Sequence, residues 1–266
     1  MNRFDQLLLT TALTLAAGAV NAAQLVALDQ QGVLHHIDIG DLKVTDSVTV
    51  RGADQLRGID VRPSDNKLYA LGNGVHLYTL DMQTGQATAL EDMRTALPGS
   101  KHAVVDFNPV ADRLRLLSED GTNLRVNVDT GEVVTDGSVA YVEDFERGEY
   151  MEEIVAGAYT NAYSGAQETT LYTIDVDSGM LMRQEPPNEG TQKPVGLIAE
   201  DMDTAAMDIA SDGQGGNTAF VLYNGTLHTV ELRSGQANAI GLIADLPENI
   251  IDIAILPQSQ GASAGE

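Results

Sequence analysis

The sequence contains no cysteine, and this absence excludes several kinds of structure and chemistry. A chain without cysteine forms no disulfide, no thiolate metal site and no cysteine nucleophile. Basic residues are also scarce, because 15 lysines and arginines stand against 39 aspartates and glutamates, for a net charge of −24. Nucleic acids and anionic membranes both favour a cationic surface, so this balance argues against either as a partner.

Lysine is especially rare and occurs only at Lys43, Lys67, Lys101 and Lys193. We interpret the acidity as adaptation to a salty medium, where screening weakens the repulsion among exposed carboxylates. The alternative interpretation is a surface that binds cations, and it fits the same composition.

A long apolar run occurs only near the N-terminus. Leu7–Val20 is apolar or small, Arg3 precedes it, and Val20-Asn21-Ala22 fits cleavage after Ala22. Fourteen residues are too few to span a bilayer as a helix, and no later stretch approaches 18 apolar residues. We therefore interpret residues 1–22 as a secretory signal peptide. The expected mature protein is exported, periplasmic or extracellular, without membrane insertion, and has 244 residues.

The segment Leu56–Leu90 is the clearest copy of a unit that recurs along the chain. Its pattern predicts four short strands separated by turns, at Gly58–Val61, Lys67–Leu71, Val75–Leu80 and Gln86–Leu90. Thr84-Gly85 suits a hairpin turn that ends in a left-handed residue, which glycine adopts without steric cost. Four antiparallel strands within about 35 residues form one blade of a β-propeller.

Two features of this unit recur at a nearly fixed period. The hairpin glycine has counterparts with successive separations of 45, 46, 48 and 56 residues, at Gly40, Gly85, Gly131, Gly179 and Gly235. The opening strand recurs at Gly58–Val61, Val104–Phe107, Ala206–Ile209 and Ile250–Ile253. This spacing predicts five blades.

The last opening strand has no blade after it, and the first blade, at Leu25–Asp29, has no opening strand before it. We therefore expect Ile250–Leu256 to complete the first blade and close the ring, which would remove exposed sheet edges. A β-sandwich is the alternative all-β fold, but it requires neither a fixed period nor a displaced terminal strand. The expected organisation is one propeller domain over residues 23–257, a disordered tail over residues 258–266, and a monomer.

An aspartate recurs in the middle of the opening strands, at Asp60, Asp106, Asp208 and Asp252, while the fourth blade has Gly157-Ala158 there. A ring of carboxylates around a central channel could bind a cation such as Ca²⁺. The alternative, which we favour, is structural: each aspartate accepts backbone N–H groups of its own or the adjacent blade. No cofactor is otherwise indicated.

The third blade is more polar than its neighbours and carries Arg113, Arg115 and Arg125 on expected strands. Their guanidinium groups could hold a carboxylate or sulfate ligand, or could pair internally with Asp106 or Asp112. No HExxH, GxSxG, Walker or dinucleotide-binding motif is present.

Four segments of the chain together resemble a known family: GIDVRP followed by LYALGNG, DFNPVADRLRLLSEDGTNLRVNVDTG, AYTNAYSGAQETTLYTID, and PPNEGTQKPVG. The chain is similar over about Leu25–Leu256 to the bacterial exported family catalogued as a domain of unknown function, DUF 4394. The resemblance implies a propeller-like exported protein and brings no established activity. It also implies that certain polar residues belong to the family pattern, so we consider Arg113, Asn123, Arg125, Tyr159 and Asn161 as candidate ligand-binding residues.

Two functions are compatible with these observations. The regular blades and the lack of a catalytic motif favour an exported binding or interaction module for a small molecule or a protein. The alternative is a metal-assisted hydrolase or lyase, similar to a lactonase, in which the channel aspartates hold the cation. Propellers host both kinds of function, so the fold does not decide between them.

Overall fold

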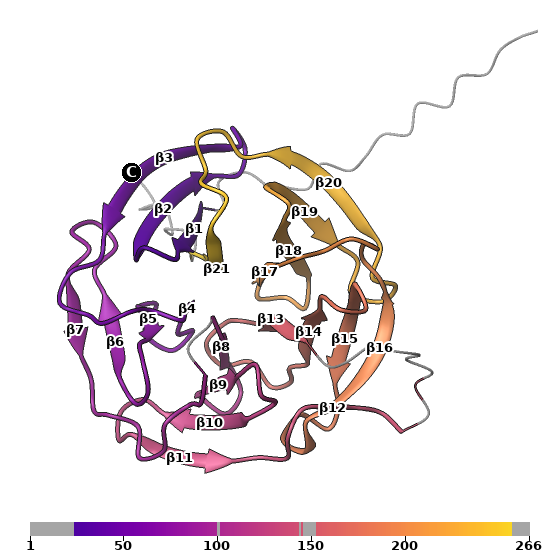
Figure 1. Ribbon diagram of the computed structural model, residues 1–266, viewed down its shortest axis with the longest axis horizontal. Helices are drawn as coiled ribbons and strands as arrows, with labels where there is room; N and C mark the ends of the chain where they lie inside the picture. Colours follow the sequence, from indigo (N-terminus) through magenta and orange to yellow (C-terminus); the bar gives the residue numbers. More distant parts are fainter. Residues whose placement is uncertain (1–23, 100–101, 144, 146–152, 257–266) are drawn as a thin grey trace, which may run out of the picture.

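The computed structural model describes residues 24–99, 102–143, 145 and 153–256. The segments interpreted as signal peptide and tail lie outside the described residues. One short 3-10 helix, η1 (Pro187–Glu189), accompanies strands that form five small sheets around a central axis (Figure 1). The expected five-bladed β-propeller is therefore confirmed.

We number the sheets as blades 1 to 5 in chain order and give their strands from the centre of the ring outwards (Figure 1). Blade 1 consists of β21 (Ile250–Ile255), β1 (Gln24–Asp29), β2 (Val33–Asp38) and β3 (Lys43–Thr49). Blade 2 consists of β4 (Gly58–Val61), β5 (Leu68–Leu71), β6 (Leu77–Leu80) and β7 (Ala87–Ala89). Blade 3 consists of β8 (Val104–Asn108), β9 (Arg113–Leu117), β10 (Asn123–Asn127) and β11 (Glu132–Thr135).

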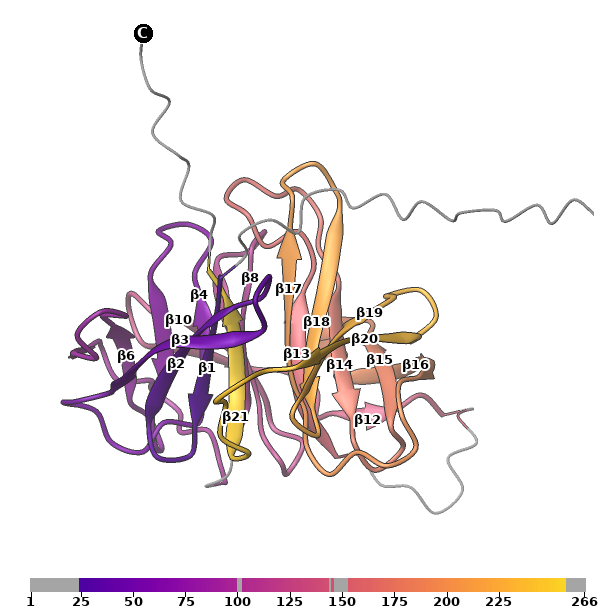
Figure 2. The same ribbon diagram turned by 90° about the horizontal axis from the view of Figure 1, so that it is seen from above.

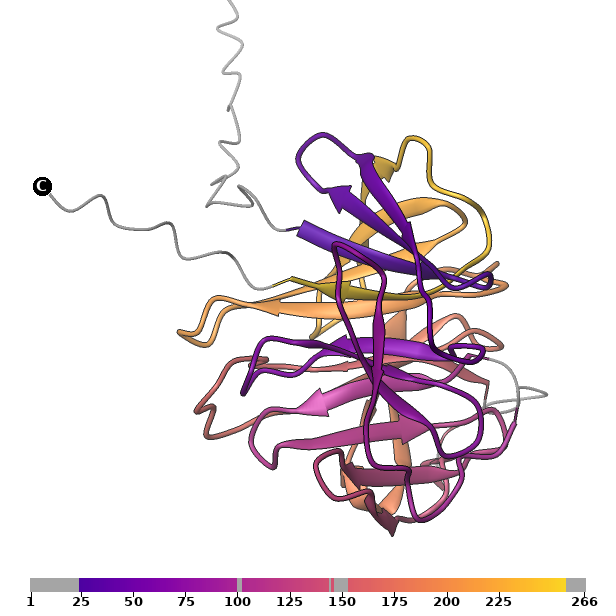
Figure 3. The same ribbon diagram turned by 90° about the vertical axis from the view of Figure 1, so that its left-hand side faces the viewer.

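Blades 4 and 5 complete the ring. Blade 4 consists of β13 (Ile154–Tyr159), β14 (Leu171–Asp175), β15 (Met180–Gln184) and β16 (Thr191–Leu197), with β12 (Ala140–Tyr141) added in parallel to β16. Blade 5 consists of β17 (Ala206–Ser211), β18 (Asn217–Tyr223), β19 (Thr226–Val230) and β20 (Ala237–Leu242). Figures 2 and 3 view this ring edge-on, and the inner strands β13, β17 and β18 run along its axis in Figure 2.

The two ends of the described chain meet in blade 1, as the repeat pattern predicts. Strand β21 pairs antiparallel with β1, with Leu25 opposite Ile255 and Ala27 opposite Ile253. The innermost strand of this blade thus comes from the C-terminal part of the chain and the other three come from the N-terminal part. This pairing closes the ring and gives the inner edge of β1 a partner strand.

The hairpin glycine Gly85 has two physical reasons to be glycine. Its φ of 71° lies in the left-handed region, and a Cβ atom there would lie 2.2 Å from the backbone oxygen of Thr49 in blade 1. The third-to-fourth-strand hairpins of blades 3 and 5 likewise contain Gly131 and Gly235, both with positive φ.

The equivalence predicted for Gly179 is wrong. Gly179 lies between β14 and β15, which are the second and third strands of blade 4. The third-to-fourth-strand hairpin of this blade is instead built around η1 and ends at Gly190. The connection between β13 and β14 is long, so the second-to-third-strand turn of blade 4 falls where the spacing predicts the third-to-fourth-strand turn. Spacing alone therefore assigned Gly179 to the wrong turn.

The hydrophobic core is divided among the boundaries between blades. Apolar side chains of blades 1 and 2, 2 and 3, 4 and 5, and 5 and 1 form four clusters. The boundary between blades 3 and 4 contains a buried polar network centred on Arg115, which is described below. Among the described residues, no helix has the length and apolarity required to cross a membrane.

Candidate functional site

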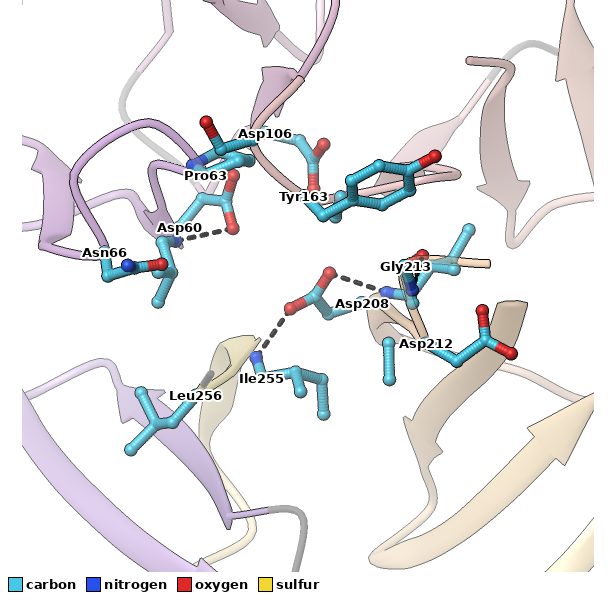
Figure 4. Close-up of a pocket in the computed structure, with 16 residues that line it drawn as sticks. Asp60, Pro63, Asn66, Asp106, Tyr163, Asp208, Asp212, Gly213, Ile255 and Leu256 are labelled. Carbon is cyan, nitrogen blue, oxygen red and sulfur yellow. Dashed lines mark hydrogen bonds between the residues drawn. The ribbon is translucent and has the colours of Figure 1, made fainter. Parts of the chain in front are cut away.

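A pocket of about 650 Å³ lies at one end of the central channel (Figure 4). Its walls come from the connections between the first and second strands of blades 2, 4 and 5, which carry Pro63, Tyr163 and Asp212. The end of β21 adds Ile255 and Leu256. Blade 3 contributes Asp106, so all five blades contribute to one space. Loops carried by a rigid scaffold commonly hold functional residues.

Three of the four recurring aspartates line this pocket. Carboxylate oxygens of Asp60, Asp106 and Asp208 all lie within 4.8 Å of one another (Figure 4). All three side chains are buried. The fourth, Asp252, is also buried but lies outside this group of three.

Every one of the four carboxylates accepts a backbone N–H from the next blade around the ring. The N···O distances are 2.8 Å from Ile59 to Asp252, 2.7 Å from Phe107 to Asp60, 2.9 Å from Tyr159 to Asp106 and 2.6 Å from Ile255 to Asp208. These bonds are the ones that the structural interpretation predicts. The convergence of three carboxylates is also what a cation site would require, so one set of residues meets both geometric expectations.

Blade 4 has Gly157 in place of the aspartate, and a side chain there would be crowded. A Cβ atom on Gly157 would lie 3.0 Å from the backbone carbonyl oxygen of Tyr172 and 3.1 Å from Val104 Cγ1. The link from blade 4 to blade 5 is made by an amide pair instead. Asn217 Oδ1 accepts the Asn161 backbone N–H at 2.7 Å, and Asn217 Nδ2 donates to Asn161 Oδ1 at 3.0 Å.

The environment of the three converging carboxyl groups favours their neutral form. Burial raises the pKa of Asp60 and of Asp106 well above the ordinary range, and the neighbouring carboxylates raise both further. Burial also raises the pKa of Asp208, to about 6, against the effect of the N–H bonds from Ile255 and Ile209. A positive charge in the pocket would reverse this preference, because it would stabilise the ionised carboxylates.

The pocket is acidic and has hydroxyl groups on its walls. Asp212 adds a fourth carboxylate, and Tyr163, Ser164 and Ser211 add hydroxyls (Figure 4). Among the described residues that line it, none is lysine, arginine or histidine. The pocket therefore suits a ligand that is positively charged or that donates several hydrogen bonds, and it disfavours an anion.

Three of the five residues singled out by the resemblance lie in the polar network between blades 3 and 4. Arg115 is buried and donates to Tyr159 Oη, Asn123 Oδ1, Asp136 Oδ2 and Asn188 Oδ1 at 2.5–3.1 Å. Arg125 donates to both oxygens of Asp136. Burial acts to raise the pKa of Asp136, but the bonds from the two arginines outweigh it and hold that pKa below its ordinary value.

This network binds blade 3 to blade 4 through Arg115, with Asp136 rather than Asp106 or Asp112 as the shared acid. Arg113 is separate from it and donates to the backbone oxygens of Ala111 and Asp112. Asp112 instead pairs with Arg62, with N···O distances of 2.6 and 2.8 Å. The five candidates therefore do not converge on one site, and a ligand-binding role for them stays a prediction.

Sequence reasoning did not identify the loop residues of the pocket. Tyr163 and Asp212 lie in connections whose lengths differ from blade to blade, so the repeat gives no equivalent positions for them. The one available signal was the Gly-rich segment Ser211–Asn217, which is typical of an extended hairpin and lies beside the pocket.

The family model described as "Domain of unknown function (DUF4394)" matches residues 21–254, nearly the whole chain. The chain belongs to the DUF4394 family. This confirms the resemblance found in the sequence. No curated protein matches the DUF4394 chain in sequence.

Solved structures that resemble the DUF4394 chain share little sequence with it. A protein of unknown function from Bacteroides thetaiotaomicron VPI-5482 has 13% identity and a TM-score of 0.56, over 89% of this chain and 62% of that one. A protein of unknown function from Bacteroides caccae has 8% identity and a TM-score of 0.45, over 90% and 100% of the two chains. The dihydro-heme d1 dehydrogenase NirN has 12% identity and a TM-score of 0.40, over 82% and 44%. At 13% identity, the similarity to the Bacteroides thetaiotaomicron protein concerns the fold alone.

Proposed function

We propose that this protein is a non-catalytic binding module that recognises a small ligand in the pocket at the end of its central channel. The observation that supports this proposal is the pocket itself. It has a volume of about 650 Å³, buried carboxylates and a lining contributed by all five blades. Small-molecule sites typically are concave spaces of this size with a few convergent polar groups.

The chemistry of the walls defines the ligand class. Four aspartates and three hydroxyl-bearing residues face the space, together with the apolar side chains of Ile255 and Leu256. An organic cation or a compound rich in hydroxyl groups would match these partners. The raised pKa values of the buried carboxyl groups mean that a cation would bind with release of protons.

The test is a thermal-shift and calorimetric screen of the protein from residue 23 onwards. The panel contains organic amines, sugars and other polyols, with carboxylate and phosphate anions as negative controls. A ligand that binds only the native state at about 100 times its Kd adds about 2.7 kcal/mol of stability. Amines or polyols should raise the melting temperature and anions should not.

Asp106→Asn supplies the matching variant, because the amide oxygen can still accept the Tyr159 N–H. Asp81→Asn is the control: Asp81 is exposed in the hairpin between β6 and β7 and accepts the N–H groups of Gln83 and Thr84. The Asp106 variant should bind its ligand at least about tenfold more weakly, which corresponds to about 1.4 kcal/mol. A panel without any stabilising compound, or equal binding by both variants, would reject the proposal.

A second candidate, the metal-assisted hydrolase or lyase, is favoured by the convergence of Asp60, Asp106 and Asp208 within 4.8 Å. Ca²⁺ takes six to eight oxygens at about 2.3–2.6 Å, so one ion can contact three carboxylates spaced in this way. The donor set fits a hard cation, although Asp60 and Asp208 already accept backbone N–H groups on both oxygens. The positions that the carboxylates leave open would face the pocket, where a bound ion would polarise a carbonyl oxygen.

Metal dependence separates the two candidates. If the carboxylates hold a cation, EDTA should lower the melting temperature by several degrees, Ca²⁺ should restore it, and Asp106→Asn should remove the response. Hydrolysis of a lactone panel with and without Ca²⁺ then tests catalysis. An absence of any response to EDTA and Ca²⁺ would reject the metal candidate and leave the binding module standing.

We also propose export to the periplasm or the cell exterior. This rests on the pattern of residues 1–22, which lie outside the described residues. N-terminal sequencing of the protein recovered from the periplasm or medium should begin at Ala23. Recovery of the full-length chain from the cytoplasm would contradict this localisation.

A further inference from the structure

A group of nucleophilic and titratable side chains lies on blade 1, outside the pocket. His35 stands between an acid and a hydroxyl: its Nε2 lies 3.1 Å from Asp29 Oδ2 and its Nδ1 lies 2.9 Å from Ser47 Oγ. The three residues come from the neighbouring strands β1, β2 and β3, and His35 is directly opposite Ser47. An acid that orients an imidazole beside a hydroxyl is the arrangement that activates a serine nucleophile on unrelated folds.

The hydrogen bonds of Asp29 determine which imidazole nitrogen carries the proton. Asp29 Oδ1 accepts the backbone N–H groups of Gln31 and Val33 at 2.9 and 2.8 Å, and Asp29 Oδ2 is the oxygen that faces His35 Nε2. A carboxylate only accepts hydrogen bonds, so Nε2 of His35 must donate to it. Nδ1 of the neutral ring is then an acceptor, and the Ser47 hydroxyl donates its proton towards it.

The acid and the imidazole are buried and the hydroxyl is exposed, as this chemistry requires. Asp29 and His35 are 5% and 7% exposed, so both are held by the blade. Ser47 is exposed on β3, the outermost strand of blade 1, where a reagent can reach it (Figure 1). A purely structural trio would not require its hydroxyl to lie at the surface.

We propose that Ser47 is an activated nucleophile that becomes acylated by small activated esters, with His35 as its base and Asp29 as the residue that positions His35. The substrate class follows from the surroundings of Ser47. In the Ser-His-Asp template, the N–H of the serine itself helps to stabilise the oxyanion. Here the Ser47 N–H donates to Asp46 Oδ1 at 2.8 Å, so the reaction must depend on a good leaving group.

The acylation step conserves atoms and charge. Ser47 Oγ attacks the ester carbonyl while its proton passes to His35 Nδ1. The carbon–oxygen bond to the leaving group then breaks, and the departing alkoxide or phenoxide takes the proton from His35. The products are the acylated serine and the free alcohol or phenol, and no oxidant, reductant or metal is consumed.

The test uses p-nitrophenyl acetate with the protein from residue 23 onwards, followed by intact-mass measurement and peptide mapping. The control within the same molecule is Ser64, an exposed serine whose Oγ donates to Asp112 Oδ1 without an intervening imidazole. We expect one acetyl group on Ser47 and none on Ser64 over the same time. Ser47→Ala should remove the modification.

His35→Gln tests the role of the imidazole, because glutamine can still bond to both neighbours but is not a base. Loss of general-base catalysis should slow acetylation of Ser47 by about 10²-fold or more. Circular dichroism melts establish that the variant is folded. The proposal fails if Ser47 reacts no faster than Ser64, a comparison that needs no variant, or if folded His35→Gln reacts at the wild-type rate.

Discussion

Replacing Asp208 by asparagine should change how the stability of the propeller depends on pH. Burial raises the pKa of Asp208 to about 6, while the N–H bonds from Ile255 and Ile209 oppose this rise. An aspartate in an unfolded chain has a pKa of about 3.9. The folded protein therefore binds this proton more tightly than the unfolded chain does. The stability that results is present below the unfolded pKa and is lost as the pH rises through about 6.

The size of the effect follows from the two pKa values. Between about pH 5 and about pH 7.5, a pKa of about 6 in the folded state removes roughly 1–2 kcal/mol of unfolding free energy. Asparagine has no such proton to lose, and its amide oxygen still accepts one of the two backbone N–H groups. The unfolding free energy of the wild type minus that of Asp208→Asn should thus fall by this amount over the interval.

Urea denaturation in the presence of EDTA measures this difference, because the chelator removes any contribution from bound cations. Asp41→Asn is the control, since Asp41 is an exposed aspartate in the turn between β2 and β3. Its difference from the wild type should remain nearly constant with pH. If the Asp208 difference is equally constant, the carboxyl group is not desolvated in the way described and the reasoning is refuted.

Three further predictions concern the links between blades and the surface charge. Asp106→Ala should lower the unfolding free energy by about 1–3 kcal/mol in urea denaturation, because the Tyr159 N–H loses its acceptor; an unchanged midpoint would contradict the link. Asp136→Ala should lower the unfolding free energy by about 3 kcal/mol or more, because it leaves Arg115 buried without its carboxylate. The control Glu132→Ala, on the exposed strand β11, should lower it much less. The melting temperature should rise clearly from low salt to about 1 M NaCl, since screening relieves repulsion at a net charge of −24; a flat curve would remove the halophilic interpretation.

The residue pattern of the chain was sufficient to predict the architecture. Each blade repeats its turns and apolar strands at a nearly constant spacing, so positions such as Gly85 and Gly131 can be equated from the residue pattern alone. The unpaired opening strand at Ile250–Ile253 required a partner, and only the first blade lacked one. These inferences hold because strand patterns and turn residues are local properties of the chain. They fail where an insertion changes the local count, as at Gly179.

The site was determined only by the tertiary structure. The sequence shows a column of aspartates, but it does not show that Asp60, Asp106 and Asp208 converge while Asp252 remains apart. That difference depends on the three-dimensional arrangement of inner strands that belong to different blades. The same reason applies to Asp29, His35 and Ser47, whose hydrogen bonds cross two strand pairings. Register and packing between strands fix such distances, and neither is encoded in the spacing of residues along one segment.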